Sequence, residues 1–182
     1  MDGINGMTGG YSLVVLLSLT YLNHQLGFVD PDFLGVVLLA VFVFNIFNFR
    51  KDAKCFAGDV GAISIAFITL FLVGRLIIAT QDITYLLLLA VYGVDTGLTI
   101  LHRLGLGERI TEPHRKHLYQ ILVNEMNLSH IGVSSLYMGL QLSVSVGLVF
   151  SENEKWAYSF CCLGILGIGY RVIYIRNKVR VS

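Results

Sequence analysis

One short stretch, CFAGDVGA at residues 55–62, sets a glycine-flanked carboxylate, Asp59, directly before a long apolar segment. Three basic residues lie just upstream between positions 50 and 54, and the apolar segment continues to Thr80. A helix needs about 20 apolar residues to cross a bilayer, so the stretch predicts that Asp59 lies at the end of a membrane-spanning helix. A lone carboxylate between two glycines suits a cation, or a phosphate–cation pair, held close to the backbone.

The composition of the whole chain supports a membrane protein. The chain has 182 residues, of which 55% are hydrophobic and only 14% are charged, against about 25% charged residues in soluble domains. Six segments are apolar and long enough to span a bilayer, namely 10–29, 32–49, 60–80, 82–101, 129–150 and 156–175. The sequence therefore predicts an all-α, polytopic transmembrane bundle that forms one membrane domain over residues 1–182.

The basic residues are distributed unevenly among the connections between these segments. Ten of the thirteen lie in alternate connections and the C-terminal tail, whereas the intervening turns contain only Lys155. By the positive-inside rule this pattern places the loops 50–59 and 102–128, together with both termini, in the cytoplasm. The expected location is the cytoplasmic (inner) membrane, which the chain crosses several times.

The loop 102–128 is the longest and most polar connection. Pro113 suits the first turn of a helix, and the apolar spacing that follows predicts an amphipathic helix over 113–126 lying along the membrane. His114 and His117 would then share one face near the positive end of this helix. The two residues between them are basic, so the segment is interpreted either as an anion-binding site or as a basic helix exposed to solvent.

Polar side chains also occur inside the apolar segments. A carboxylate within the membrane is costly and points to function by default, so Asp95 is interpreted either as a site residue or as a helix–helix hydrogen-bond partner. Asn45 and Asn48 lie on one face of the second span, where such side chains favour helix packing.

Three motifs occur in a fixed order: MDGING at residues 1–6, FAGDVGA at 56–62 and PHRKHLYQ at 113–120. Together they resemble the polyprenyl-phosphate N-acetylhexosamine-1-phosphate transferases, and specifically the C-terminal half of that superfamily. The resemblance covers essentially the whole chain. The third motif lacks three consecutive histidines and is similar to the branch that initiates O-antigen, capsule or teichoic-type glycans.

The resemblance implies an activity and a set of catalytic residues. N-acetylhexosamine-1-phosphate would pass from a UDP-sugar to a polyprenyl (undecaprenyl) phosphate, releasing UMP and initiating cell-envelope glycan synthesis. By motif position, Asp59 is the expected ligand of Mg²⁺, with Mn²⁺ as the alternative, since oxygen donors suit these ions. Asp2 is an expected catalytic carboxylate, and His114 and His117 would stabilise the diphosphate or the leaving group.

The resemblance also implies which residues contact the substrates. Asn5, Arg109 and Arg115 are the expected substrate-binding residues. The expected partners are a UDP-N-acetylhexosamine, a polyprenyl phosphate lipid and the membrane, with a homodimer left open and no nucleic acid.

The chain also departs from the family pattern. Relatives carry an Asp-Asp pair in an earlier loop and about ten or eleven spans, and no Asp-Asp occurs in this sequence. We therefore expect an N-terminally truncated chain that is inactive alone; robust UMP release by the purified chain would contradict this. A second hypothesis is a non-enzymatic membrane subunit or a transporter-like bundle, in which Asp95 and Arg75 would line a polar path.

Overall fold

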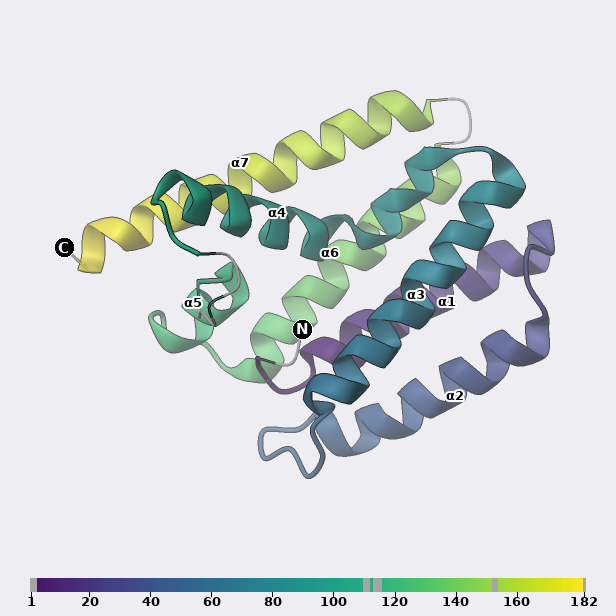
Figure 1. Cartoon of the computed structure of the whole chain (residues 1–182), viewed down its shortest axis with the longest axis horizontal. Helices are drawn as coiled ribbons and strands as arrows, with labels where there is room; N and C mark the ends of the chain where they lie inside the picture. The colour runs from purple at the N-terminus through teal and green to yellow at the C-terminus, as the bar shows by residue number, and fades with distance from the viewer. Residues whose placement is uncertain (1–2, 110–111, 113–115, 152–153, 182) are drawn as a thin grey trace.

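The computed structural model describes residues 3–109, 112, 116–151 and 154–181, with only the backbone described from residue 175 onward. These residues form seven α-helices and one 3-10 helix, and no strand (Figure 1). The elements are α1 (Met7–Leu26), α2 (Pro31–Asn48), α3 (Gly58–Thr80), η1 (Ile83–Leu89), α4 (Ala90–Gly105), α5 (Leu118–Asn124), α6 (His130–Phe150) and α7 (Lys155–Val181). The expected polytopic helix bundle is confirmed.

Five segments of the described chain are long and apolar enough to span a membrane: α2, α3, the continuous pair η1–α4, α6 and α7. The remaining long helix, α1, corresponds to the expected span at 10–29. It packs on α2, α3 and α6 and buries several polar residues, including Thr8, Ser12 and Asn23. Because α1 is surrounded largely by protein, its sequence does not need the uniform apolarity of a helix that faces lipid.

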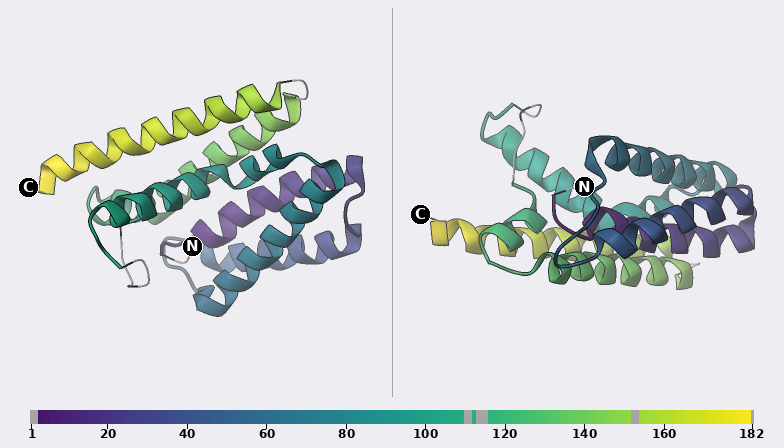
Figure 2. Two further views of the ribbon diagram at one scale, coloured as in Figure 1. Left: turned by 45° about the horizontal axis from the view of Figure 1, so that its top comes forward. Right: turned by 90° about the horizontal axis from the view of Figure 1, so that it is seen from below.

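The outer helices carry the lipid-facing surface. Figures 1 and 2 show α2 and α7 on opposite sides of the bundle. Large apolar side chains remain exposed on α2, α3 and α7, among them Val36, Phe67 and Ile168. In water such surface would be unfavourable, whereas in a bilayer it contacts hydrocarbon.

The span η1–α4 changes from a 3-10 helix to an α-helix near Leu89. Backbone groups left unpaired at such a change must find partners, because the bilayer interior supplies no water. The fully buried side chain of Gln141 bonds to both sides of this change: its Oε1 accepts from the Val91 N–H at 3.2 Å, and its Nε2 donates at 2.9 Å to the Leu87 carbonyl, which also accepts from the Ala90 N–H. Tyr11 Oη also donates to Gln141 Oε1, at 2.7 Å.

The connections lie at two ends of the bundle. We call the end formed by residues 3–6, 49–59, 104–109 and 116–129 the motif end, because it carries described parts of all three motifs. The other end, formed by the turns after α1, α3 and α6, is called the opposite end. At that end Arg75 donates to the Phe28 carbonyl at 3.2 Å.

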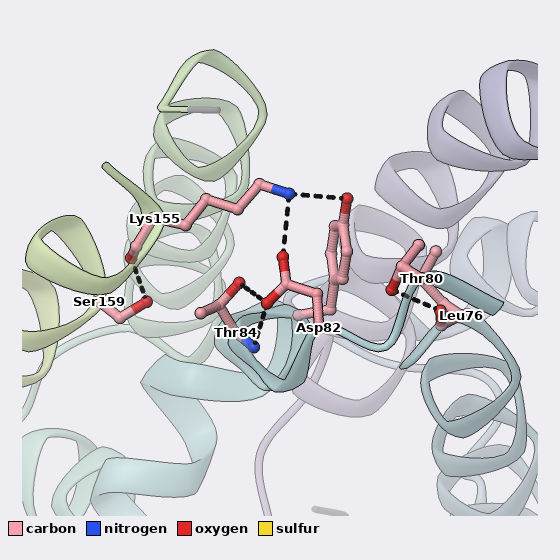
Figure 3. A network of polar contacts seen from close by, with 7 residues as sticks. Leu76, Thr80, Asp82, Thr84, Lys155 and Ser159 are labelled. Atoms are coloured by element: carbon pink, nitrogen blue, oxygen red, sulfur yellow. Dashed lines mark hydrogen bonds and ion pairs between the residues drawn. The ribbon is translucent and has the colours of Figure 1, made fainter. Parts of the chain in front are cut away.

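An ion pair joins η1 to α7 at the opposite end (Figure 3). Lys155 Nζ lies 3.0 Å from Asp82 Oδ2 and donates to Tyr85 Oη at 3.1 Å. Asp82 Oδ1 accepts from the backbone N–H of Thr84 at 2.9 Å and from its hydroxyl at 2.6 Å. Partial burial raises the pKa of Asp82, but the hydrogen bonds from Thr84 and Lys155 outweigh burial, and the net pKa is lowered.

This pair predicts a pH-dependent contribution to stability. Because the pKa of Asp82 is lower in the folded protein, its carboxylate stabilises the fold above about pH 4. That contribution disappears as the pH falls through the lower, folded value. We expect Asp82→Asn to reduce the free energy of unfolding by about 1 kcal/mol at neutral pH, since the pair is partly exposed, and to flatten this part of the acid dependence.

The measurement is thermal unfolding in detergent between pH 3 and pH 7. Asp52→Asn is the matched control, because Asp52 is an exposed carboxylate in the loop after α2. Equal losses of stability in the two variants at pH 7 would show that the Asp82–Lys155 pair makes no specific contribution.

Candidate functional site

Asn5 of the first motif connects three parts of the motif end. Its side-chain Nδ2 donates to the carbonyls of Arg50 and Lys51, at 3.2 and 2.9 Å. Its backbone N–H donates to His130 Nδ1 at 3.2 Å, and its carbonyl accepts from the Ser134 hydroxyl at 2.8 Å. The expected substrate-binding residue therefore also fixes the first motif to the α2–α3 loop and to the start of α6.

A second link between the same segments passes through Asn48, the last residue of α2. Asn48 Oδ1 accepts from the Gly6 N–H at 2.8 Å, and Asn48 Nδ2 donates to the Cys55 carbonyl at 2.7 Å. Gly6 has φ +80°, and a Cβ there would lie 2.5 Å from Phe49. Glycine is therefore required at this turn, both for its backbone conformation and for the close approach of Phe49.

Asp59 of the second motif follows the α2–α3 loop, which the hydrogen bonds of Asn5 and Asn48 hold in place. It occupies the first turn of α3, directly after Gly58, which has φ +60°. Its side chain is exposed at the motif end. A carboxylate in the first turn of a helix is stabilised by the helix dipole, so the position keeps a charged oxygen donor facing solvent.

The carboxylates of the motifs are the candidate ligands for Mg²⁺. The described part of the chain contains no group of three His, Cys, Asp or Glu side chains placed to hold a metal. Mg²⁺ usually binds through one or two carboxylates, several waters and substrate phosphates rather than in an all-protein cage. The exposed carboxylate of Asp59 fits that mode of binding. Asp2, the other expected carboxylate, lies outside the described residues.

The segment after α4 is organised by Arg103, whose side chain is only 2% exposed. Arg103 Nε pairs with Glu108 Oε2 at 3.2 Å, and its Nη2 donates to the carbonyls of Arg109 and Glu112. Glu108 also pairs with Lys116. The hydrogen bond from Lys116, followed by that from Arg103, lowers the pKa of Glu108 despite some desolvation.

Arg109 itself projects into solvent from this segment. Its side chain is 83% exposed, and its Nη1 lies 3.9 Å from Glu112 Oε1. Such an exposed pair contributes little energy, so the guanidinium remains accessible at the motif end. Arg115 and His114 lie outside the described residues.

His117 is placed differently from the sequence-based expectation. The helix expected over 113–126 begins at Leu118 as α5, and His117 precedes it in an extended conformation, with φ −65° and ψ 144°. The expected helical i,i+3 relation between His114 and His117 is therefore wrong at His117. The α5 side chains Leu118, Tyr119, Ile121, Leu122 and Val123 are buried, so this helix packs into the bundle rather than lying freely along the membrane.

The start of α5 is set by Asp95, a buried residue of α4. Asp95 Oδ1 accepts from the Leu118 N–H at 2.9 Å, and Oδ2 accepts from the Tyr119 N–H at 3.4 Å. Tyr137 of α6 donates its hydroxyl to Oδ2 at 2.7 Å. Of the two interpretations of Asp95, the structure shows the helix–helix hydrogen bond and adds a cap on α5.

The imidazole of His117 lies in the same environment. Its Nδ1 is 3.6 Å from Asp95 Oδ1, and its side chain is 15% exposed. The ring stacks on Tyr119, with centroids 5.5 Å apart and an interplanar angle of 14°, and it faces Tyr92 at 6.4 Å. His117 is thus held in an aromatic setting beside a carboxylate.

The first and third motifs also meet. A Cβ on Gly3 would lie 2.8 Å from Gln120 Nε2 and 3.0 Å from the Tyr119 ring. The structure therefore places Asn5, Asp59, Arg109 and His117 at one end of the bundle, on segments that contact one another. Among the described residues Asp59 and Arg109 are exposed there, whereas His117 lies mostly below the surface.

Two residues that organise this end were not recognised as such from the sequence. From the sequence, Arg103 is one of the basic residues of its loop, and Asn48 is predicted to favour helix packing. The signal is weak, because both partners of Asn48 and two of those of Arg103 are backbone groups, which any residue type supplies, whereas Glu108 gives Arg103 a side-chain partner.

The model of the family described as Glycosyl transferase family 4 matches residues 1–80. This region contains the first two motifs and the helices α1, α2 and α3, and the match agrees with the resemblance seen in the sequence. No curated protein and no solved structure matches the chain.

Proposed function

We propose that this chain takes part in the transfer of N-acetylhexosamine-1-phosphate from a UDP-sugar to polyprenyl phosphate, with release of UMP. The observation that carries the proposal is the placement of Asp59. It is an exposed carboxylate on the first turn of α3, inside the region that matches the glycosyl transferase family 4 model. The coarser assignment, to membrane sugar-phosphate transferases, rests on that match.

The reaction would proceed at the motif end. An oxygen of the lipid phosphate attacks the sugar-linked phosphorus, a new P–O–P bond forms, and the bond to UMP breaks, so UMP departs with the bridging oxygen. Bound Mg²⁺ would neutralise charge on the diphosphate. Asp59 would hold that ion, and Arg109, with Arg115, would attract the negatively charged phosphates.

His117 has a separate role in this proposal. It lies beside Asp95 and within the cap of α5, so its ring is restrained by neighbours on two elements. A restrained imidazole suits hydrogen bonding to a diphosphate or a leaving phosphate, because little reorganisation is needed when charge develops. Asp2 and His114 are assigned to the same reaction by motif alone.

We further propose that the motif end faces the cytoplasm of a cytoplasmic membrane. The basic side chains of the α2–α3 loop and of the segment after α4 lie at this end, whereas the opposite end has the ion pair of Lys155. The positive-inside rule favours this orientation. It would give the motif end access to soluble UDP-sugars.

The alternative, a non-enzymatic or transporter-like bundle, has less support. A transporter path is expected to gather polar residues around a site near the middle of the bilayer. Near the motif end, the carboxylate of Asp95 accepts hydrogen bonds from the first residue of α5 and from Tyr137. Arg75 donates to the Phe28 carbonyl at the opposite end. These two residues therefore do not line one path.

The proposal is tested in membranes of the native cell after deletion of this chain. Membranes are supplied with Mg²⁺, polyprenyl phosphate and, in turn, UDP-N-acetylglucosamine and UDP-N-acetylgalactosamine. We expect UMP release and the sugar diphospholipid, measured by mass spectrometry, to fall with at least one donor and to return when the chain is re-expressed. Unchanged product with every UDP-N-acetylhexosamine would contradict the proposal.

A further inference from the structure

A groove of about 720 Å³ lies between α4 and α7, and α7 runs on the opposite side of the bundle from α2 (Figure 1). Leucine and isoleucine side chains of both helices form its apolar wall, including Leu98, Leu163 and Ile168. Gly164 and Gly167 of α7 also line it, and a Cβ added to either would meet no atom within 4 Å. The groove is therefore open along α7, with an apolar wall beside these glycines.

One part of the groove is basic. His102, in the last turn of α4, and Arg171 of α7 both contribute to its wall. The ring of His102 packs edge-on against Tyr174, with centroids 4.8 Å apart. Because both helices run toward the motif end here, the basic groups lie toward the bundle end and the apolar wall extends into the span.

This combination matches an amphiphile with a negatively charged head. A phosphate headgroup would meet the guanidinium, which is always charged and forms paired hydrogen bonds with phosphate. The acyl chains would cover the apolar wall of the groove. Tyrosine rings suit the boundary between headgroups and hydrocarbon.

We propose that this groove binds one anionic phospholipid of the surrounding bilayer, with its phosphate at Arg171 and His102. The occupant is a lipid of the bilayer rather than a reacting lipid because of where the groove lies. The helix α7 packs on α4, α6 and η1, whereas α3, which carries Asp59, packs on α1 and η1. A lipid in the groove is thus separated from Asp59 by the helices between them, and it would hold α7 against α4.

The test is retention of lipid by the purified chain in native mass spectrometry. The chain is exchanged from detergent into mixed micelles that contain phosphatidylglycerol or phosphatidylcholine. We expect one phosphatidylglycerol per chain to be retained, with weaker retention of phosphatidylcholine. Arg171→Gln should weaken phosphatidylglycerol retention about tenfold, and Gly167→Leu should abolish it by filling the groove.

Two matched controls separate the groove from general effects. Gly35→Leu adds the same side chain to α2, where a Cβ also meets nothing within 4 Å. Lys54→Gln removes an exposed positive charge elsewhere at the motif end. Both should retain phosphatidylglycerol like the original chain, and circular dichroism should show the same helix content in all four variants.

Several outcomes would overturn the proposal. These are equal retention in Arg171→Gln and the original chain, equal loss in the groove variants and their controls, or a preference for polyprenyl phosphate over phosphatidylglycerol in competition. Displacement of the lipid by millimolar inorganic phosphate would likewise show that only an anion site exists. The readout does not require turnover, so its result is independent of the transferase proposal.

Discussion

Replacing Asp59 by asparagine is expected to lower sugar-phosphate transfer by at least about 100-fold in native membranes, while the chain stays folded and inserted. The side chain is exposed, so the substitution keeps its size and leaves no cavity. It removes a charged oxygen donor that would serve Mg²⁺. The cost to folding is limited to the interaction of the charge with the start of α3, about 0.3–1 kcal/mol.

Two measurements separate the role of Asp59 from a loss of fold. Transfer is compared in deletion membranes that express the original chain, Asp59→Asn or the control Asp52→Asn, which alters an exposed carboxylate of the preceding loop. Binding of Mn²⁺ in the presence of UDP-N-acetylglucosamine is followed by electron paramagnetic resonance on purified chain. We expect Asp59→Asn to weaken this binding roughly 10- to 100-fold, with Asp52→Asn unchanged.

The transfer assay and the Mn²⁺-binding assay test different parts of the proposal. Full transfer by Asp59→Asn would remove the metal role from this residue but leave the transferase proposal standing. Transfer that does not depend on the chain at all would contradict the activity itself. Normal Mn²⁺ binding with lost transfer would make Asp59 a residue that positions substrate.

The sequence predicted the bundle because the length and apolarity of a span are local properties. Five expected spans coincide with apolar helices, and their ends differ by a few residues. The remaining expected span, α1, is less apolar than the others, because it buries polar residues against neighbouring helices. Which neighbours surround a helix is not a local property of its sequence. The 3-10 turn in η1 was not predicted either, since it depends on Gln141 from a helix some 50 residues away.

For the candidate site, the sequence predicted which end of the bundle carries the motifs but not how they are held. Alternating connections place residues 3–6, the α2–α3 loop and the segment after α4 together. Apolar spacing predicted a helix over 113–126, whereas α5 begins only at Leu118, because its first residue depends on the carboxylate of Asp95, which is distant in sequence. The apolar spacing of a segment does not predict a capping residue that belongs to another helix.

The second large effect is expected at Asp95, which is 2% exposed. Asp95→Ala removes the acceptor of four donors: the N–H groups of Leu118 and Tyr119 and the hydroxyls of Tyr137 and Thr99. Buried donors without partners are costly, so we expect a loss of about 3–5 kcal/mol from the free energy of unfolding. Asp95→Asn, which keeps one side-chain oxygen, should lose less.

The loss should also have a definite location. The carboxylate caps α5 and lies beside His117, so its removal should free the segment from His117 to Asn124 before the long helices unfold. Hydrogen exchange of the α5 amides in detergent measures this directly. We expect faster exchange in α5 and an unchanged rate in α2, which does not contact this network.

Tyr137→Phe is the matched control for this network, because it removes only one of the four donors and leaves Asp95 capping α5. We expect it to cost about 1 kcal/mol and to leave exchange in α5 slow. In the double variant with Asp95→Ala, the tyrosine change should add little, since its acceptor is already absent. Strict additivity of the two changes, or normal α5 exchange in Asp95→Ala, would mean that Asp95 does not hold the histidine segment in place.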